Sequence, residues 1–365
     1  MVTQADSPCW EYLVVVRQSQ EFMPKLEIPN NASIHTLRSF LARAKPFCDT
    51  TSPAILKLHP KWAFMDPMAL ALTAAWGGWC QRNNLPVDVK DMHSQVNYAA
   101  RMKLFKHLNV PCHTDIEEHE EAGRFVPLRQ VNSISDLNSV LADISALLHL
   151  DDQPEGLAAV RYCVSELIRN VLEHAASPEG AYVCAHRYLG KGRKPRSAKQ
   201  ARATTKAMKR VTIAVADCGT GISTHLGRSY PSALTSGREA LRLAMQMGVT
   251  GAQKHGMYGA TENAGAGLFI TRAIARATGG YFVLISGDAA FRLNRVALQS
   301  NRQLFHNALD DPRSNFYKFR SPWQGTIACV EVATQEIPDF QKFFRWVWDQ
   351  LPPRTTAGGR IKFTS

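Results

Sequence analysis

Residues 155–175 read EGLAAVRYCVSELIRNVLEHA, and they carry the strongest helical pattern in the chain. Apolar side chains recur there at intervals of three and four residues, which predicts a helix with one buried side. Glu166, Asn170 and His174 follow one another at steps of four residues. Such steps drift little around a helix, so these polar side chains form one ridge. The ridge is either an ordinary exposed face or a place where a carboxylate and an amide serve a metal ion and a water molecule.

A glycine-rich turn follows a predicted strand over residues 211–215. The chain then reads Ala-Asp-Cys-Gly-Thr-Gly-Ile, from Ala216 to Ile222. Glycines directly after a strand let the backbone turn sharply and approach a ligand. The end of the strand would present Asp217 as a fixed hydrogen-bond acceptor, although an ordinary Asp-Gly turn would have the same composition.

A second glycine-rich segment, Glu262-Asn-Ala-Gly265-Ala-Gly267-Leu268, leads into a predicted helix that ends near Thr278. The start of a helix offers unpaired N–H groups and the positive end of the helix dipole, which suit phosphate groups. The segment is not a Walker A loop, because it lacks the Gly-Lys-Ser/Thr ending. It is not a Rossmann fingerprint either, because no strand feeds straight into it.

The order of these elements is more specific than any one of them. Glu-x-x-x-Asn on a helix is followed by Asp-x-Gly-x-Gly-Ile after a strand, by Gly-x-Gly-Leu before a helix, and by Gly325-Thr326 in a late strand. This order resembles the N, G1 and G2 boxes and the terminal Gly-Thr of the GHKL (Bergerat-fold) ATPases, and most closely the anti-sigma-factor serine kinases. The resemblance implies an α+β fold: a two-layer sandwich in which helices cover a mixed sheet.

The resemblance also implies cofactors and a role for each matching residue. ATP and Mg²⁺ would be bound, with Asn170 as the magnesium ligand and Asp217 as the acceptor of the adenine amino group. Glu166 stands where members of the superfamily hold a general base for water or for a serine hydroxyl. His174 receives no catalytic role. The other nucleotide contacts that the resemblance implies are Gly219, Gly221, Ile222, Gly265, Gly267, Leu268 and Thr326.

The resemblance divides the chain into four parts. An ATP-binding domain is expected over residues 123–335, preceded by an N-terminal extension (1–45) and a smaller α/β domain (46–122), and followed by a C-terminal helix and tail (336–365). Within the ATP-binding domain, residues 223–264 would form a lid over the nucleotide.

The smaller domain loosely resembles a STAS domain, the fold of anti-sigma-factor antagonists. The likeness rests on a strand–helix–strand–helix order and on the segments Trp62 to Met68, Val87 to Val89 and Ser94 to Leu108, the last of which predicts a single amphipathic helix. In the antagonists a phosphorylatable serine follows the aspartate. Here Pro67 follows Asp66, so this sequence departs from the family pattern at the phosphorylation site.

Charge and composition add expectations about partners and location. The net charge is +12, and residues 187–210 contain ten Lys or Arg and no acidic residue. This basic insert is either a solvated surface loop or an arm for an acidic partner or nucleic acid. The eight cysteines form no Cys-x-x-Cys pair, which favours reduced thiols and a cytoplasmic protein. The most apolar stretch, Pro67 to Cys80, is shorter than the ~20 residues needed to cross a membrane, so a buried helix is expected.

The sequence therefore predicts an ATP- and magnesium-binding regulator that acts on a protein partner, as a Ser/Thr kinase or as an ATP-gated switch. An ATP-hydrolysing conformational clamp and a non-catalytic ATP sensor remain as alternatives. Homodimer formation and enzymatic activity are left open.

Overall fold

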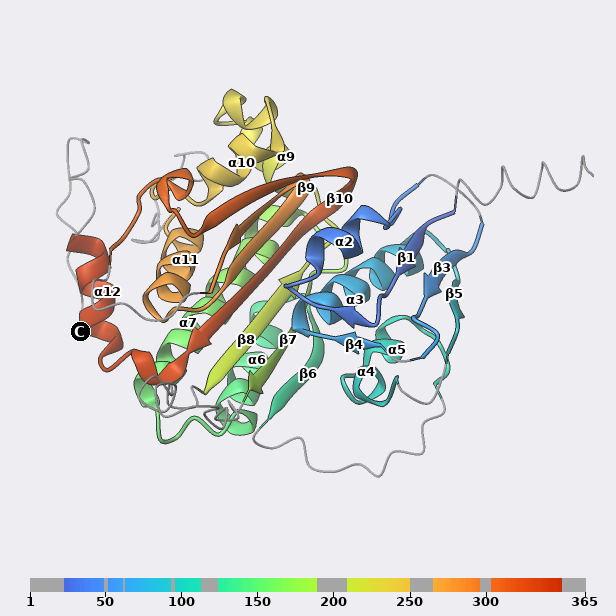
Figure 1. Ribbon diagram of the computed structural model, residues 1–365, viewed down its shortest axis with the longest axis horizontal. Coiled ribbons are helices and arrows are strands. Elements are labelled where there is room, and N and C mark those ends of the chain that lie inside the picture. The colour runs from blue at the N-terminus through green and yellow to red at the C-terminus, as the bar shows by residue number, and fades with distance from the viewer. Residues whose placement is uncertain are drawn as a thin grey trace, which may run out of the picture.

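The computed structural model describes residues 23–48, 52–61, 63–92, 96–112, 124–188, 209–249, 265–295 and 303–349. A five-stranded sheet lies at its centre, with long helices on one face and the N-terminal layer on the other (Figure 1). Most of the basic insert, the end of the expected lid, Trp62, Ser94 and the two chain ends lie outside the described residues.

The central sheet has the strand order β6-β7-β8-β10-β9. Each neighbouring pair is antiparallel, so the expectation of a mixed sheet is wrong here. The reason is the position of β10. It lies between β8 and β9, which run in the same direction and would otherwise be parallel neighbours. The strands are β6 (Phe125–Val131), β7 (Ala181–Tyr188), β8 (Arg210–Ala216), β9 (Phe282–Leu293) and β10 (Ser314–Ala333).

The helical layer contains the helix predicted from residues 155–175. It is observed as α7 (Pro154–Asn170), continued by the π-helical turn η2 (Val171–Ala175). Next to α7 lie α6 (Ile134–Leu147) and α11 (Gly267–Ala277). Apolar side chains of the three helices and of one face of the sheet form a single hydrophobic cluster. Burial of this cluster is the main term that holds the helices on the sheet.

Two further helical groups border this layer. The described part of the expected lid, residues 223–249, contains most of α9 (Gly221–Gly227), the 3₁₀ turn η3 (Pro231–Leu234) and α10 (Gly237–Ala244), which stand at one end of the sheet (Figure 1). The predicted C-terminal helix is confirmed as α12 (Phe340–Asp349), and it packs against α7.

The N-terminal layer has the expected alternation of strands and helices. Its main sheet is parallel, with the order β1-β3-β5. The single helix expected over residues 94–108 is wrong: the chain forms two short helices, because Lys103 adopts a left-handed conformation with φ of 63°. The elements are β1 (Lys25–Glu27), β2 (Asn31–Ala32), α2 (Leu37–Ala42), β3 (Ala54–Lys57), β4 (Phe64–Met65), α3 (Pro67–Arg82), β5 (Val87–Lys90), α4 (Asn97–Arg101) and α5 (Leu104–His107).

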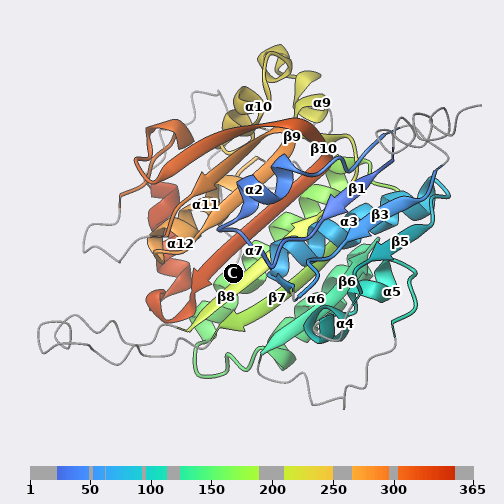
Figure 2. The same cartoon turned by 45° about the vertical axis from the view of Figure 1, so that its right-hand side comes forward.

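Helix α3 joins the two halves of the molecule. Every residue from Pro67 to Cys80 is buried, as the sequence predicts, because α3 has the small parallel sheet on one side and β7 and β8 on the other (Figures 1 and 2). Gly78 lies so close to Tyr182 that a Cβ there would come within 2.2 Å of its hydroxyl. One hydrophobic cluster therefore includes α3 and the second face of the central sheet. Among the described helices, none has the length and apolar character that a membrane span needs.

Candidate functional site

The polar ridge of α7 meets the start of α11. A Cβ on Gly267 would come within 2.2 Å of Oε2 of Glu166, so only glycine allows α11 to approach this carboxylate so closely. Helix α11 begins without a side-chain cap, and its first backbone bond runs from Ile270 N to Ala266 O. The backbone N–H groups of the helical residues before Ile270 therefore have no partner within the helix, and they lie beside the ridge. The structure thus places two of the sequence-predicted elements against each other.

The carboxyl group of Glu166 titrates with a pKa above its ordinary range. Burial raises the pKa of its carboxyl group, and Glu173 raises it further, while Arg169 lowers it. A carboxyl group whose pKa moves toward neutrality is better matched to general-base chemistry than an ordinary exposed one. One turn earlier on α7, the Tyr162 hydroxyl is buried with no hydrogen-bond partner among the described residues.

Asn170 ends α7, and the ridge continues in η2. The Asn170 Nδ2 atom is buried and has no partner within the described part of the chain. In η2, His174 packs against His225 of α9, with ring centroids 4.7 Å apart. Turns of π-helix are rare and are frequently found at functional sites.

The end of η2 contacts the glycine turn after β8. The Ala175 carbonyl accepts a 2.8 Å hydrogen bond from Thr220 N, and a Cβ on Gly219 would lie only 2.1 Å from the same oxygen. The α7 ridge and the Asp217 turn are therefore neighbours, although their segments are distant in the sequence.

Asp217 lies at the end of β8 with only 1% of its surface exposed. Its Oδ1 accepts a hydrogen bond of 2.7 Å from Gly219 N, whereas Oδ2 is buried without a partner among the described residues. Burial raises the pKa of this carboxyl to about 7. A buried acceptor without a partner is unfavourable by itself, so Oδ2 suits a ligand that supplies an N–H group.

A bulge in β10, residues 323–326, holds this turn in place. The pairing of β10 with β9 shifts register there, as expected of bulges, which are common near functional sites. Asp217 N donates to Thr326 O at 2.9 Å, and Trp323 Nε1 donates to Asp217 O at 3.2 Å. Gln324 Nε2 donates to Cys218 O at 3.0 Å. Gly325 has φ of +86°, and a Cβ there would lie 2.4 Å from Asp217 O.

The second half of the turn is fixed by Ser286 of β9. Ile222 N donates to Ser286 Oγ at 2.9 Å, and that hydroxyl donates to Gly325 O at 2.8 Å. Gly221, with φ of +76°, passes beside the same hydroxyl. Ser286, Trp323 and Gln324 were not predicted from the sequence. Trp323 and Gln324 directly precede the Gly-Thr pair, and this position is the one sequence signal that could have indicated these two residues. Ser286 has no such signal.

The remaining predicted residues lie at the edges of this arrangement. Gly265 has φ of +77°, and its carbonyl accepts a 3.0 Å hydrogen bond from Gly248 N at the end of the described lid. Leu268 and Ile222 are half-buried against the core of the helical layer. Thr326 is placed by its backbone, which pairs with Asp217.

An open hollow of about 400 Å³ borders the Asp217 turn next to the end of α3. Its lining includes neither Asp217 nor Glu166, Asn170 or Gly267, so it adjoins only the glycine turn that follows Asp217. Its lining residues are Arg82, Ala176, Pro178, Cys218, Gly219, Thr220, Thr224 and Gln324.

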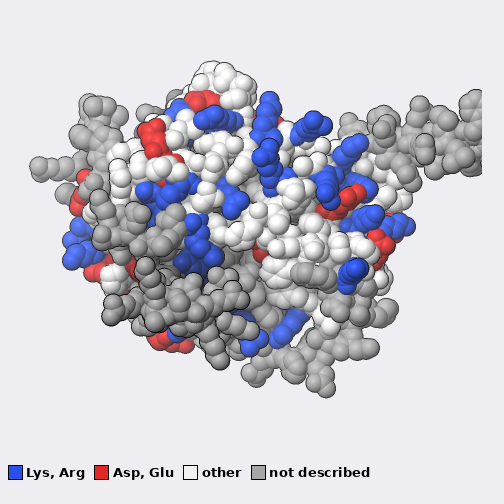
Figure 3. Space-filling view, viewed as in Figure 1, with Lys and Arg blue, Asp and Glu red and all other residues white. Residues whose placement is uncertain are grey.

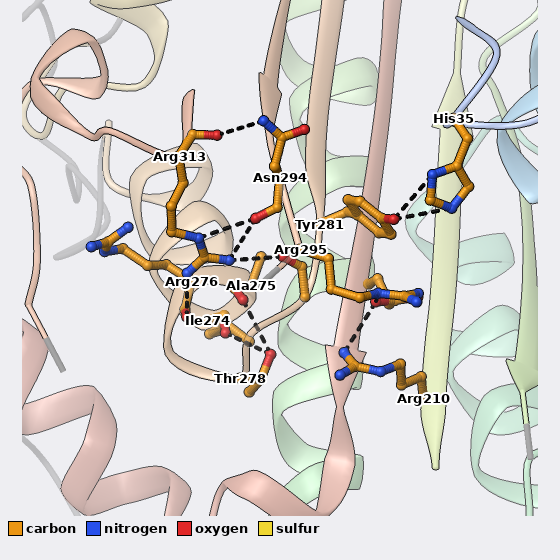
Figure 4. Close-up of polar contacts among 12 residues, drawn as sticks. His35, Arg210, Ile274, Ala275, Arg276, Thr278, Tyr281, Asn294, Arg295 and Arg313 are labelled. Atoms are coloured by element: carbon orange, nitrogen blue, oxygen red, sulfur yellow. Dashed lines mark hydrogen bonds and ion pairs between the residues drawn. The ribbon is translucent and has the colours of Figure 1, made fainter. Parts of the chain in front are cut away.

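The two ends of the basic insert are tied to the protein. Arg187 Nη1 donates to Leu148 O at 2.7 Å, and Lys209 pairs with Asp152 at 2.7 Å. Arg210 pairs with the buried Glu331 at 3.1 Å, in the region shown in Figure 4. These intramolecular contacts anchor the first and last residues of the insert, and the Lys209–Asp152 pair lies on the surface. Elsewhere Lys and Arg are spread over the face seen in Figure 3.

The described residues contain no group of three or more His, Cys, Asp or Glu arranged to hold a metal ion. An amide such as that of Asn170, completed by phosphate oxygens and water, remains a suitable environment for Mg²⁺, which favours oxygen ligands and keeps several waters.

Neither a known protein-family model nor a curated protein matches this chain.

Proposed function

We propose that this chain is a GHKL-type regulatory protein that binds Mg-ATP and acts on a protein partner. The observation that carries the proposal is the contact of Gly267 with Glu166 on one side of α7, while Ala175 at the end of the same helix contacts the Asp217 turn. One helix thus joins a phosphate-binding helix start to a base-selecting acceptor.

The residues present fit the proposed ligand. Asp217 Oδ2 is a buried acceptor in need of an N–H group, which the adenine amino group supplies. The uncapped start of α11 suits the phosphates. Asn170 would hold Mg²⁺, which neutralises phosphate charge when bound. Glu166, whose pKa is raised by burial, lies beside the proposed phosphate-binding start of α11.

The proposed output is Ser/Thr phosphorylation of the partner, or a switch set by the ATP state. Glu166 lies beside the start of α11, where a general base for a serine or threonine hydroxyl would stand in the kinase. An ATP-hydrolysing clamp would use the same carboxylate to activate water, and it remains the second candidate.

Binding is tested with a fluorescent ATP analogue, with and without Mg²⁺. Asn170→Ala should lose the magnesium-dependent part of the affinity. Asn138→Ala is the matched control, since Asn138 is exposed on α6. Equal magnesium dependence in the two variants would remove Asn170 as a ligand. Wild-type protein that binds no analogue would refute the proposed function.

The output is tested by incubation with ATP labelled in the γ-phosphate and a cell lysate. A labelled serine or threonine on another protein indicates a kinase, and free labelled phosphate alone indicates a clamp. Binding without either product indicates a sensor and would contradict a catalytic role for Glu166.

A further inference from the structure

We propose that Trp323 is a positioning residue that sets the preference of the site for adenine. It does so by holding the Asp217 carbonyl through its indole N–H group. The inference rests on the proposed function, because it concerns the same base-selecting turn.

Asp217 is held at both of its backbone groups by the β10 bulge. Its N–H group donates to Thr326 O at 2.9 Å, and its carbonyl accepts from Trp323 Nε1 at 3.2 Å. Its Oδ1 is already occupied by Gly219 N. With the backbone and one carboxylate oxygen fixed, Oδ2 has little freedom left. The direction in which Oδ2 meets a base therefore depends on the indole bond.

The indole has its own fixed support in the N-terminal layer. Trp323 is 3% exposed, and its ring meets the edge of Phe47 at a centroid distance of 5.0 Å. Phe47 meets Trp79 of α3 at the same distance. Three aromatic rings thus connect α3 to the residue that holds Asp217. The N-terminal layer thereby helps to position the acceptor that would bind the nucleobase.

Gln324 makes a similar bond to the Cys218 carbonyl, but its side chain is exposed and competes with water for that bond. The indole bond of Trp323 is buried. A buried hydrogen bond is more costly to lose than one that water can replace, so the selectivity is assigned to Trp323.

Misplacing the acceptor should affect adenine binding more than phosphate binding. Phosphates would bind at the start of α11, whereas the contacts of Trp323 are with the Asp217 carbonyl and the Phe47 ring. Loss of the indole bond should therefore change the ratio of ATP to GTP affinity. A reduction of about three- to tenfold corresponds to one hydrogen bond of ordinary net strength.

The test compares Trp323→Phe with Tyr281→Phe. Tyr281 is also buried, and its hydroxyl group forms a 3.0 Å hydrogen bond with His35 Nε2, away from the Phe47 ring. Each variant keeps an aromatic ring and loses one side-chain hydrogen bond, so both should lower thermal stability. Mg-ATP and Mg-GTP are titrated into each protein by calorimetry. The ATP-to-GTP affinity ratio should fall in Trp323→Phe alone.

A wild-type ratio in Trp323→Phe, or an equal fall in Tyr281→Phe, would overturn the inference while leaving the proposed function intact. Wild-type protein that binds neither nucleotide overturns both. If Trp323→Phe does not fold, Phe47→Leu takes its place, because it keeps the indole and removes the ring that orients it. That variant should lower the ratio as well, and an unchanged ratio would refute the inference.

Discussion

Gly267 lies directly against Glu166, so that a Cβ at position 267 would come within 2.2 Å of the carboxylate Oε2. The contact joins the start of α11 to the middle of α7. It explains why a glycine occupies the first residue of a buried helix, where most other residues would favour the helix more. The same contact places the half-buried Glu166 carboxyl group beside the backbone N–H groups that begin α11.

Replacement of Gly267 by Ala should displace the Glu166 side chain. The added methyl group would overlap Oε2, and overpacking of this kind costs about 1–3 kcal/mol. In a Glu166→Ala background the obstructing atoms are gone, so the same replacement should cost much less. Urea unfolding of the four proteins measures both costs. Equal destabilisation in the two backgrounds would show that the contact does not form.

Glu166→Ala should keep Mg-ATP binding and abolish turnover. In the wild-type protein the base is the ionised carboxylate, and burial raises its pKa above the ordinary value of 4.5. Turnover should therefore increase as the pH rises through that raised pKa and then level off. Phosphate release over a pH series gives this profile. Unchanged release by Glu166→Ala would remove Glu166 as the base.

Asp217→Asn should weaken adenine recognition and yet stabilise the fold at high pH. The folded protein holds the Asp217 proton up to a pKa of about 7, whereas the ordinary value is 3.8. The native state therefore binds more protons between these two values, and stability contributed by this group falls as pH rises through that window. The asparagine removes the cost of a buried charge and can still accept the Gly219 bond.

The stability difference between Asp217→Asn and wild type should therefore grow from pH 4 to pH 8. Its upper limit is about 4 kcal/mol, from the free-energy value of a pKa shift of this size. Urea unfolding at several pH values measures it. A difference that does not change with pH would show that the Asp217 carboxyl titrates normally.

Gly78 of α3 offers a test of the contact between the N-terminal layer and the central sheet. In Gly78→Ala the new Cβ would lie 2.2 Å from the Tyr182 hydroxyl oxygen, so the whole protein should lose about 1–3 kcal/mol of stability. In a Tyr182→Phe background the loss should be smaller. A single thermal transition is expected. Separate transitions, with only one of them shifted, would mean that the two layers unfold independently.

Much of the fold could be predicted from local patterns. The helical spacing of apolar residues in 155–175 predicts α7. The continuous apolar run from Pro67 to Cys80 predicts a helix that is buried on all sides, as α3 is. Gly279 predicts the end of α11. These elements are specified by nearby residues. The burial of α3 was expected, but the sheet that covers it was not. A local sequence pattern does not show which distant element packs against a helix.

Other elements were missed for physical reasons. Strand β1 lies in a part of the chain without clear periodicity, and β9 contains Gly287, which interrupts the strand pattern. In the site, the motifs indicated Asp217 and its glycines. Trp323 and Ser286 act through bonds to backbone groups far away in the sequence, and such bonds leave no spacing that a single sequence can show.

The most direct measurement is calorimetric titration of the wild-type protein with Mg-ATP and, separately, Mg-GTP. We expect one ATP bound per chain and clearly weaker binding of GTP, because Asp217 Oδ2 would accept from the adenine amino group, whereas guanine presents a carbonyl oxygen there. Equal affinity for the two nucleotides, or no binding of either, would contradict it.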